Sequence, residues 1–395
     1  MSSKAFLKIS SIANGESKRK EEEILSLLNS NLSDKETTIF YLSAVLKQPI
    51  LPVKHIISKF IDLIETSSLS EFTRQQYYNE LITLFTPPTS NVNLALLKII
   101  LNLSTILESQ KNLDEANELL KSLQIESYAQ DFKDLIEFNK FKIELNSRIA
   151  NNACLVKKYE EAESFLVRIS PILQEFKDPE YKEFLRGTYN IYAKVMTNVG
   201  KWLDVSSRLY HTKDETFDQL VIKLLIFAPS TTYKRTLLET IKDPLNSRIL
   251  TKVSDTPLFA VFNKMFDERL VFYEDFREVL RYVIKNNEFE LPNLYLTEEL
   301  SRAIIENNLI AASKIYETIT IENFIDILRI DKSFVEEVIA DMIREDRLDA
   351  LIDDITGFIQ FNVKKVQKDT LYNWKLHIVE SCTLLDQVAQ EFKDV

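Results

Sequence analysis

Glycine is almost missing from this chain, and that shortage limits the possible folds more than any other feature. Only four glycines occur in 395 residues (Gly15, Gly187, Gly200 and Gly357), where average usage would give about 28. No two of them have the spacing of a dinucleotide-binding loop, a P-loop or a hydrolase nucleophile elbow, so these sites are excluded. Sheets joined by tight turns also need glycine. The shortage, together with abundant Leu, Glu, Lys and Ile, predicts an all-α protein.

The charge balance and the ends of the chain bear on its partners. The formal net charge is −11, which argues against a nucleic-acid partner but leaves a local basic patch open. Residues 1–17 are polar and Ser-rich after the first methionine, so we expect a flexible N-terminus rather than a signal peptide. The apolar run from Val92 to Leu107 is interrupted by one lysine and two asparagines, which favours a buried helix over a membrane span. We therefore expect an intracellular, soluble protein without a membrane partner.

Apolar residues recur at steps of three and four almost everywhere, and prolines separate the segments, as expected for successive amphipathic helices. Two helix starts are indicated by the spacing of a capping box, Ser33 with Glu36 and Ser333 with Glu336. We predict that these serines cap the helices that follow them.

One short pattern recurs between successive helical segments. After a turn comes an apolar or aromatic residue, then an acidic helix start, then a small or modest side chain; the three copies begin at Leu113, Tyr159 and Trp202. The small residue would let two antiparallel helices approach, and the apolar residue would fill the space between helix pairs. The spacing exceeds the 34 residues of a strict tetratricopeptide. We therefore predict a right-handed, TPR-like helical-repeat solenoid with long helices over residues 18–308.

The pattern changes after about residue 319. Two short helices are expected next, followed by two extended runs on either side of a turn that contains Gly357. The expected helices are 320–328 and 333–344, and the expected hairpin strands end at Asp353 and Phe361. Helix, turn, helix and hairpin together predict a winged helix, which we assign to residues 309–366.

Residues 367–395 are expected to form one long amphipathic helix. Its apolar side chains form a seam that needs a hydrophobic partner: Leu371, Trp374, Ile378, Leu385, Val388 and Phe392. The seven-residue spacing suits a coiled-coil contact, whereas Ser381 and Cys382 interrupt it. The residues alone leave two alternatives open, namely packing on the chain's own winged helix and a bundle with the terminal helices of other subunits.

Helical repeats that lead into a winged helix and close with a helix resemble the PCI-domain family, which is shared by the proteasome lid, the COP-nine signalosome and translation initiation factor three. The resemblance covers the chain from about residue 105 to the end. The stretches that carry it are 307–316, 319–322, 342–347 and 352–361, with weaker echoes in 162–174 and 235–243. The Ala-Ser-Lys-Ile-Tyr sequence at 312–316 favours the signalosome branch over the lid.

This resemblance implies a non-catalytic scaffold subunit of the COP-nine signalosome, located in cytoplasm and nucleus. That complex removes the modifier Nedd-eight from cullin-RING ubiquitin ligases through a zinc isopeptidase on another subunit. The implied partners are other PCI subunits, the isopeptidase with its MPN partner, and the cullin-RING ligase substrate. The C-terminal seam would then lie in a bundle of subunits. The paralogous PCI subunit of the 26S proteasome regulatory lid and a nucleic-acid-binding PCI protein of mRNA export remain alternatives.

No catalytic, cofactor or metal site stands out from the sequence. His55, His211 and His377 lack the spacing of a zincin or of an isopeptidase H-x-H pair. Cys154 and Cys382 have no ligand spacing, and we expect buried free thiols. A Ser-His-Asp arrangement stays open, because its members need not be adjacent in sequence, but no residue is marked as a nucleophile. We therefore predict no enzymatic activity, no cofactor and no metal.

A winged helix raises nucleic acid as a partner, so the charge of its second helix matters. From Asp331 to Asp346 there are six acidic and two basic residues, a net charge of −4, which would repel a duplex. Lys364, Lys365 and Lys368 beyond the hairpin are too few to reverse this. We predict that no nucleic acid binds, and that the exposed strand edge pairs with a neighbouring protein instead.

Overall fold

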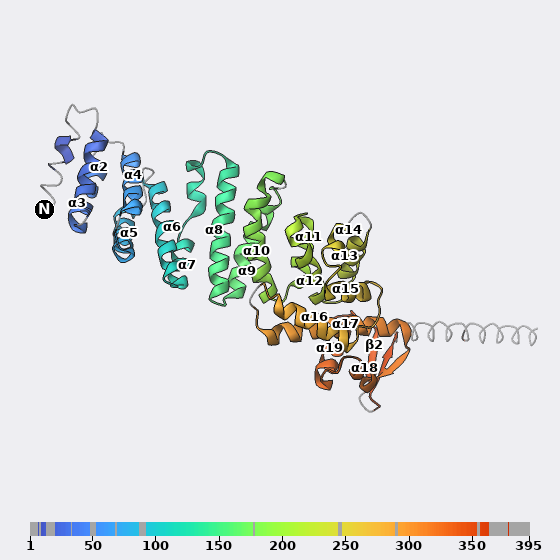
Figure 1. Cartoon of the computed structure of the whole chain (residues 1–395). Helices are drawn as coiled ribbons and strands as arrows, with labels where there is room; N and C mark the ends of the chain where they lie inside the picture. The colour runs from blue at the N-terminus through green and yellow to red at the C-terminus, as the bar shows by residue number, and fades with distance from the viewer. Residues whose placement is uncertain are drawn as a thin grey trace, which may run out of the picture. The chain divides into compact units, whose positions relative to one another are not determined.

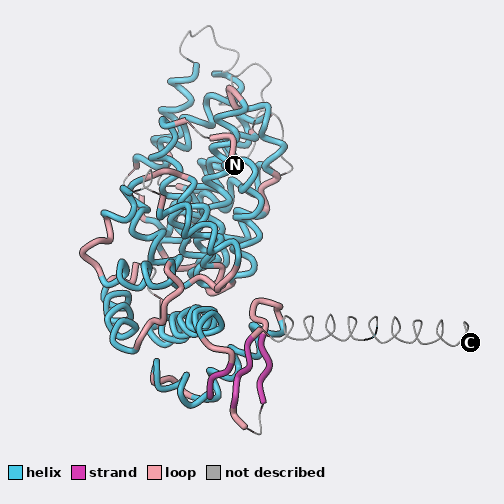
Figure 2. The backbone as a smooth tube through the Cα atoms, turned by 90° about the vertical axis from the view of Figure 1, so that its right-hand side faces the viewer, coloured by secondary structure: helices cyan, strands magenta, loops and turns pink. Residues whose placement is uncertain are grey.

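A computed structural model describes residues 7, 9–12, 20–32, 34–47, 53–67, 69–86, 92–176, 178–243, 247–288, 291–353, 356–362 and 378. The chain divides into two compact units, residues 1–195 and 196–395. The described residues are predominantly helical, and the strands among them belong to the second unit (Figures 1 and 2). The predicted fold class, helical repeats followed by a winged-helix module, is confirmed.

The first unit consists of helices that pack in sequence order (Figure 1). Its elements are α2 (Lys20–Ser30), α3 (Lys35–Leu46), α4 (Val53–Thr66), α5 (Glu71–Phe85), α6 (Asn93–Ser109), α7 (Leu113–Lys121), η1 (Ile125–Asp131), α8 (Leu135–Leu155), α9 (Tyr159–Leu173), η2 (Pro179–Tyr181) and α10 (Lys182–Asn198), whose last residues pass the unit boundary. Helix α2 contacts α4, α3 contacts α5 and α4 contacts α6, which is the stacking of a solenoid. The run from Val92 to Leu107 forms the buried helix α6, as predicted.

The three turns predicted from the repeated pattern share one backbone geometry. Each preceding helix ends on a residue with positive φ, and the next residue donates its N–H to the carbonyl five positions back at 2.9 Å. The positive-φ residues are Lys111 (65°), Lys157 (65°) and Gly200 (80°). This is the Schellman end of a helix, in which the left-handed residue favours glycine. Two of the three turns therefore place lysine in a conformation that suits glycine better.

The small residue of each copy lies where the pattern predicts. Ala116, Ala162 and Val205 are fully buried, which allows the paired helices to approach closely. Trp202 is buried against Phe227 with a ring separation of 4.8 Å, so the third copy fills the core as expected. The repeated pattern is confirmed as a helix-to-helix turn.

The second unit consists of helices followed by a small sheet. Its elements are α11 (Trp202–His211), η3 (Glu215–Phe217), α12 (Asp218–Phe227), α13 (Thr232–Lys242), α14 (Ser247–Thr251), α15 (Pro257–Phe266), α16 (Tyr273–Lys285), α17 (Asn293–Ile315), β1 (Thr318–Thr320), α18 (Ile321–Leu328), α19 (Lys332–Arg344), β2 (Ala350–Asp353) and β3 (Phe358–Phe361). Helix α12 is almost entirely apolar and buried, and it contacts α11, α15 and α17. It is therefore the centre of this unit.

The predicted winged helix is present, with one additional strand. Helices α18 and α19 lie within one residue of the predicted ranges, and strands β2 and β3 end at the predicted residues Asp353 and Phe361. Strand β1 was not predicted; it pairs antiparallel with β3, which gives the sheet order β1-β3-β2 (Figure 2). The predicted boundary after residue 308 falls inside α17, so the change from repeats to winged helix does not coincide with a helix end.

The two predicted capping boxes were wrong by one or two residues. Helix α3 is capped by Asp34, whose Oδ1 accepts from the Thr37 N–H at 3.4 Å. Helix α19 is capped by Asp331, which accepts from the N–H of Ser333 at 3.1 Å. Aspartate caps a helix as well as serine does. Asp34 lies one residue after the predicted cap Ser33, and Asp331 lies two residues before the predicted cap Ser333.

Candidate partner-binding site

A buried carboxylate in α17 joins the winged helix to the helices that precede it. Glu306 is 1% exposed. It binds the Arg347 guanidinium through both oxygens, at 2.7 and 3.0 Å. The backbone N–H of Ser230, in the turn between α12 and α13, donates to the same carboxylate at 2.7 Å. A buried charge needs such partners, so this contact fixes the turn after α19 against two other segments.

Lys234 of α13 lies beside this cluster and is itself almost completely buried. Its ammonium donates to the Ala228 carbonyl at 2.6 Å. Burial lowers the pKa of Lys234 to about 8, while the nearby Glu306 acts in the opposite direction. We call Ser230, Lys234, Glu306 and Arg347 the polar hub of the second unit.

Two asparagines next to Glu306 hold the loop before α16. The side chain of Asn308 is fully buried, accepts from the Val271 N–H and donates to the Val271 carbonyl, both at 2.8 Å. Asn307 donates to the Arg269 carbonyl at 3.4 Å. An asparagine side chain can satisfy a backbone donor and acceptor together. Residues 307–308, which open the strongest family-like stretch, therefore position the first helix of the C-terminal module.

Arg302 of α17 clamps the second helix of the winged helix. Its two terminal nitrogens lie 2.8 Å from Glu337 and 2.8 Å from Asp341. The hydrogen bond from Arg302 lowers the pKa of Asp341. Two of the six acids that we counted from the sequence are thus compensated from α17, which reduces the expected negative charge of this helix.

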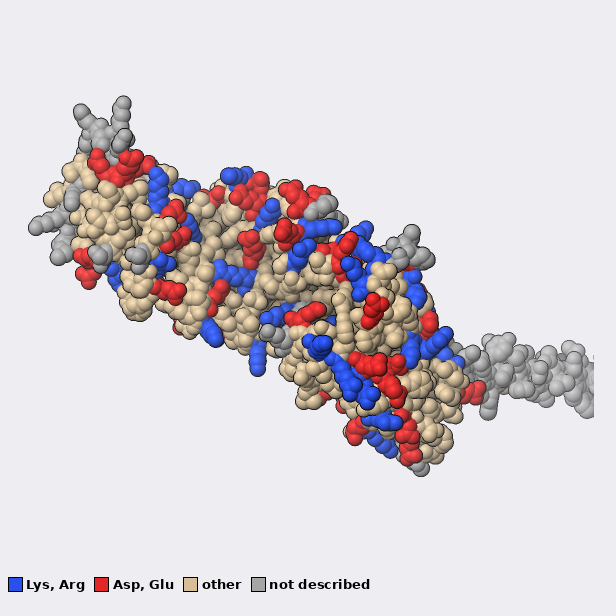
Figure 3. Space-filling view, in the orientation of Figure 1, with Lys and Arg blue, Asp and Glu red and all other residues tan. Residues whose placement is uncertain are grey.

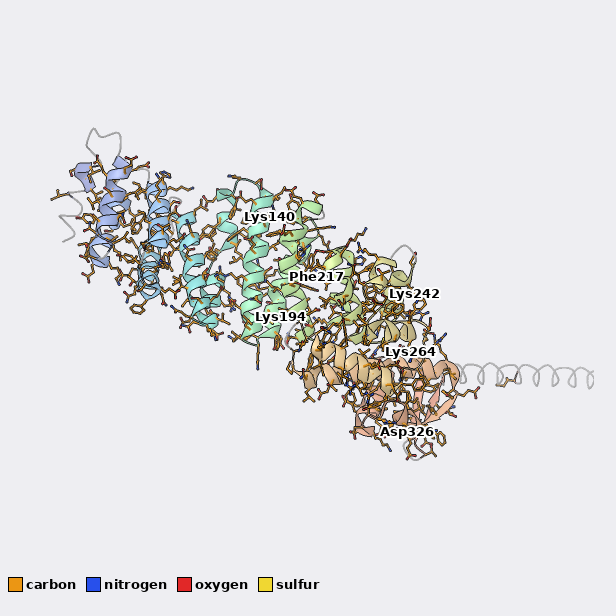
Figure 4. The ribbon with its side chains drawn as sticks, viewed as in Figure 1. Lys140, Lys194, Phe217, Lys242, Lys264 and Asp326 are labelled. Carbon is orange, nitrogen blue, oxygen red and sulfur yellow. The ribbon has the colours of Figure 1, made fainter. Side chains whose placement is uncertain are left out.

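On the face that Figure 3 shows, Lys and Arg are interspersed with Asp and Glu, and the blue side chains form only short runs. Two lysines lie over aromatic rings. Lys242 Nζ is 5.3 Å from the centre of the Phe266 ring, and Lys264 Nζ is 5.7 Å from the centre of the Phe272 ring; Figure 4 labels both lysines. Lys264 is also paired with Asp275. This face therefore lacks the long basic stripe that is typical of nucleic-acid-binding domains.

The sheet exposes one face and two outer strands. Leu351 of β2 and Phe358 of β3 share the face opposite the buried Ile359 and Phe361, and they are 51% and 44% exposed. In the described part of the chain, β1 and β2 each pair with β3 alone. Their free edges are the positions at which the predicted pairing with a neighbouring protein would occur.

The predicted seam falls almost entirely outside the described residues. Leu371, Trp374, Leu385, Val388 and Phe392 are not described, nor are His377, Cys382 and the three lysines at 364, 365 and 368. Ile378 is described as helical and is 59% exposed. The two alternatives for this helix therefore remain predictions.

The remaining candidates from the sequence lie apart from one another. His55 and His211 are exposed, and Cys154 is a buried free thiol as expected, with its pKa raised by burial. Among the described residues, no group of three or more His, Cys, Asp and Glu side chains could hold a metal ion. The described helices also include none that is long and apolar enough to cross a membrane.

The polar hub was missed at the sequence level. Its members come from positions up to 117 residues apart, and such long-range pairs leave no spacing to detect. One local signal existed, because Glu306 follows Ile304 and Ile305 and stands on the apolar side of α17. A lone acid on a buried helix face indicates a buried partner.

Comparison with known proteins agrees with this geometry. Residues 274–363 match the PCI domain, from α16 through β3. The chain is 22% identical to COP9 signalosome complex subunit 4 of Arabidopsis thaliana, over 95% of this chain and 94% of the relative. It is 25% identical to subunit 4 of Emericella nidulans over 89% of each chain. It is also 21% identical to the 26S proteasome regulatory subunit RPN5 of Saccharomyces cerevisiae, over 84% of this chain and 74% of the relative.

The stretches quoted from the sequence favour the fourth subunit of the signalosome within the family, and relatives with that name match from several organisms. The matched domain begins with α16 and contains Glu306, Arg347 and both asparagines of α17. It also includes the whole sheet. The chain therefore contains a PCI domain over residues 274–363, and over most of its length it is similar to signalosome and proteasome-lid subunits.

Proposed function

We propose that this chain is a non-catalytic scaffold subunit of a COP9 signalosome. The observation that carries the proposal is the likeness to subunit 4 of Arabidopsis thaliana, which covers 95% of this chain. It includes the helical repeats as well as the PCI domain. A likeness confined to the PCI domain would fit any PCI protein, whereas one over both units fits a subunit with the same complete architecture.

In this role the chain connects other PCI subunits with the isopeptidase and its MPN partner, and its repeats contact the cullin-RING ligase. The isopeptidase then removes Nedd-eight from the cullin, in cytoplasm and nucleus. The buried contacts of the second unit support a scaffold. Glu306 with Arg347, and Arg302 with Asp341, fix helices to one another, so these charged side chains have a structural use.

The C-terminal seam is the assembly element of this proposal. Residues Leu371, Trp374, Ile378, Leu385, Val388 and Phe392 would pack in a bundle with the terminal helices of other subunits. Ile378 is exposed in the isolated chain, which leaves this side chain available to a partner helix. The outer edges of β1 and β2 would supply a second contact with a neighbouring PCI subunit.

A second candidate is a subunit of the proteasome regulatory lid. The likeness to RPN5, at 21% identity over 84% of this chain, favours it. Both candidates require the same scaffold architecture, so the fold does not separate them.

Depleting the chain from its cells separates the two candidates. The signalosome proposal predicts that cullins accumulate in the Nedd-eight-modified form, with a normal level of ubiquitin conjugates, and that re-expression of the full chain reverses this. Accumulation of ubiquitin conjugates with unchanged cullins would assign the chain to the lid. Unchanged cullins and unchanged conjugates would contradict both.

A further inference from the structure

Three cations lie in a row on the exposed face of α16. Arg277, Arg281 and Lys285 follow one another at four-residue steps, so their side chains project from one side at intervals of about 6 Å. All three are exposed. None of them forms an ion pair with another residue in the described part of the chain.

In this respect the three cations differ from several arginines of the second unit. Other arginines of the second unit have carboxylate partners, such as Arg248 with Asp218, Arg302 with Asp341 and Arg344 with Asp341. The chain carries eleven more acidic than basic residues, so carboxylates are not scarce. A cationic row that stays unpaired under these conditions is open to an external anion.

A fourth cation joins the row from another element. The guanidinium of Arg329 lies 5.0 Å from the centre of the Tyr273 ring, and that of Arg277 lies 5.9 Å from the same centre. Arg329 ends α18 in the left-handed conformation (φ 55°), and its N–H donates to the Ile325 carbonyl at 2.7 Å. The tyrosine thus holds two cations from two helices near one point.

The same face carries acids that oppose a nucleic acid. Glu274 and Glu278 are exposed on α16 beside the cationic row. A phosphate backbone that followed Arg277, Arg281 and Lys285 would pass these carboxylates and be repelled. A protein segment can place carboxylates against the arginines and basic or neutral side chains against the glutamates, because its charges vary from residue to residue.

We propose that this face of α16, together with Arg329, binds an acidic helical segment of a partner protein. Carboxylates at four-residue steps on a helix have the same 6 Å interval as the row. Arginine binds a carboxylate through two parallel hydrogen bonds, and this geometry selects such side chains. The proposal concerns a surface separate from the C-terminal seam and does not depend on which complex the chain joins.

The test uses the full chain and a labelled, end-capped helical peptide of about 17 residues with glutamate at every fourth position. Fluorescence anisotropy at low salt measures the dissociation constant. We expect binding that weakens as salt rises, and at least tenfold weaker binding to Arg277→Glu/Arg281→Glu. The control Lys111→Glu/Lys157→Glu changes the net charge equally in the first unit and should bind as the wild type does.

Two results would overturn the proposal. One is that the Arg277→Glu/Arg281→Glu chain binds the peptide as tightly as the wild type does. The other is a wild-type dissociation constant above about 1 mM, roughly the limit of a weak contact. If the chain binds a DNA duplex of about 17 base pairs more tightly than the peptide, the partner of this face is nucleic acid and the proposal is overturned. Circular dichroism checks folding. If the charge-reversed chain is unfolded, Arg277→Gln/Arg281→Gln takes its place under the same criteria.

Discussion

Arg347→Met removes the guanidinium that pairs with Glu306 in the polar hub, while it keeps most of the side-chain length. The Glu306 carboxylate then retains the Ser230 N–H at 2.7 Å and the nearby Lys234. Loss of one partner of a buried ion pair costs roughly 3–5 kcal/mol. The Arg347 side chain is 17% exposed, so water reaches part of the guanidinium and we expect the lower end, about 3 kcal/mol. For a unit of this size that corresponds to a fall in melting temperature of about 6–12 °C.

The matched control is Arg344→Met, three residues earlier. Its side chain is 75% exposed and pairs with Asp341, so its loss should cost less than about 1 kcal/mol. Thermal unfolding measures both variants, and hydrogen exchange at β2 and β3 localises the effect. The double variant Glu306→Gln/Arg347→Met should lose clearly less free energy of unfolding than the sum of the two single variants, because each single change leaves the other partner buried and unpaired. Additive losses, or an Arg347→Met loss no larger than that of the control, would refute the hub.

Four further predictions concern separate parts of the chain. Lys157→Gly should raise the free energy of unfolding by about 0.5–1 kcal/mol in urea titrations, because φ at this position is 65°, whereas Gly200→Ala should lower it. The pKa of Lys234 in the folded chain is about 8 against an ordinary 10.5, so the unfolded chain holds the proton to higher pH. The free energy of unfolding of the wild type, relative to that of Lys234→Met, should therefore rise by roughly 2–3 kcal/mol from pH 8 to pH 10.5. A difference between the two chains that does not change with pH would contradict this. The chain should not bind random DNA or RNA duplexes at physiological salt in mobility-shift assays. Salt-sensitive binding with a sub-micromolar dissociation constant would contradict this prediction. Ile378→Asp/Leu385→Asp should abolish co-precipitation with the complex without changing the melting temperature of the chain. The reason is that burying two carboxylates in a packed bundle costs roughly several kcal/mol. If the isolated variant unfolds instead, the seam belongs to the chain's own core.

The parts of the fold that depend on local sequence were predictable. Helix periods and the Schellman turns at Lys111, Lys157 and Gly200 are set by residues within one or two helical turns of each other, so the sequence contains the whole signal. The hairpin around Gly357 is similarly local, since the Gly357 N–H donates to the Asp353 carbonyl at 2.8 Å. The same locality explains the errors in the capping boxes, where two good caps stand close together and small differences decide between them.

The parts that depend on distant residues were not predictable. Strand β1 is three residues long and exists because Ile319 pairs with Ile359, which lies 40 positions later in the chain. The local sequence of Thr318–Thr320 alone predicts the start of a helix. The charge of α19 was counted correctly, yet Arg302 from another helix compensates part of it. The hub and the cationic row on α16 likewise depend on which carboxylates lie nearby in space, and a single sequence does not contain that information.

Purification of the tagged chain from its own cells, followed by mass spectrometry of the proteins that remain bound, tests the central claim most directly. The account predicts that PCI subunits and the MPN isopeptidase of a signalosome are recovered in near-equal amounts with the chain, and that the purified assembly removes Nedd-eight from a cullin. Recovery of proteasome ATPases instead would assign the chain to the regulatory lid. Recovery of the chain alone, or with ribonucleoproteins only, would contradict the scaffold function.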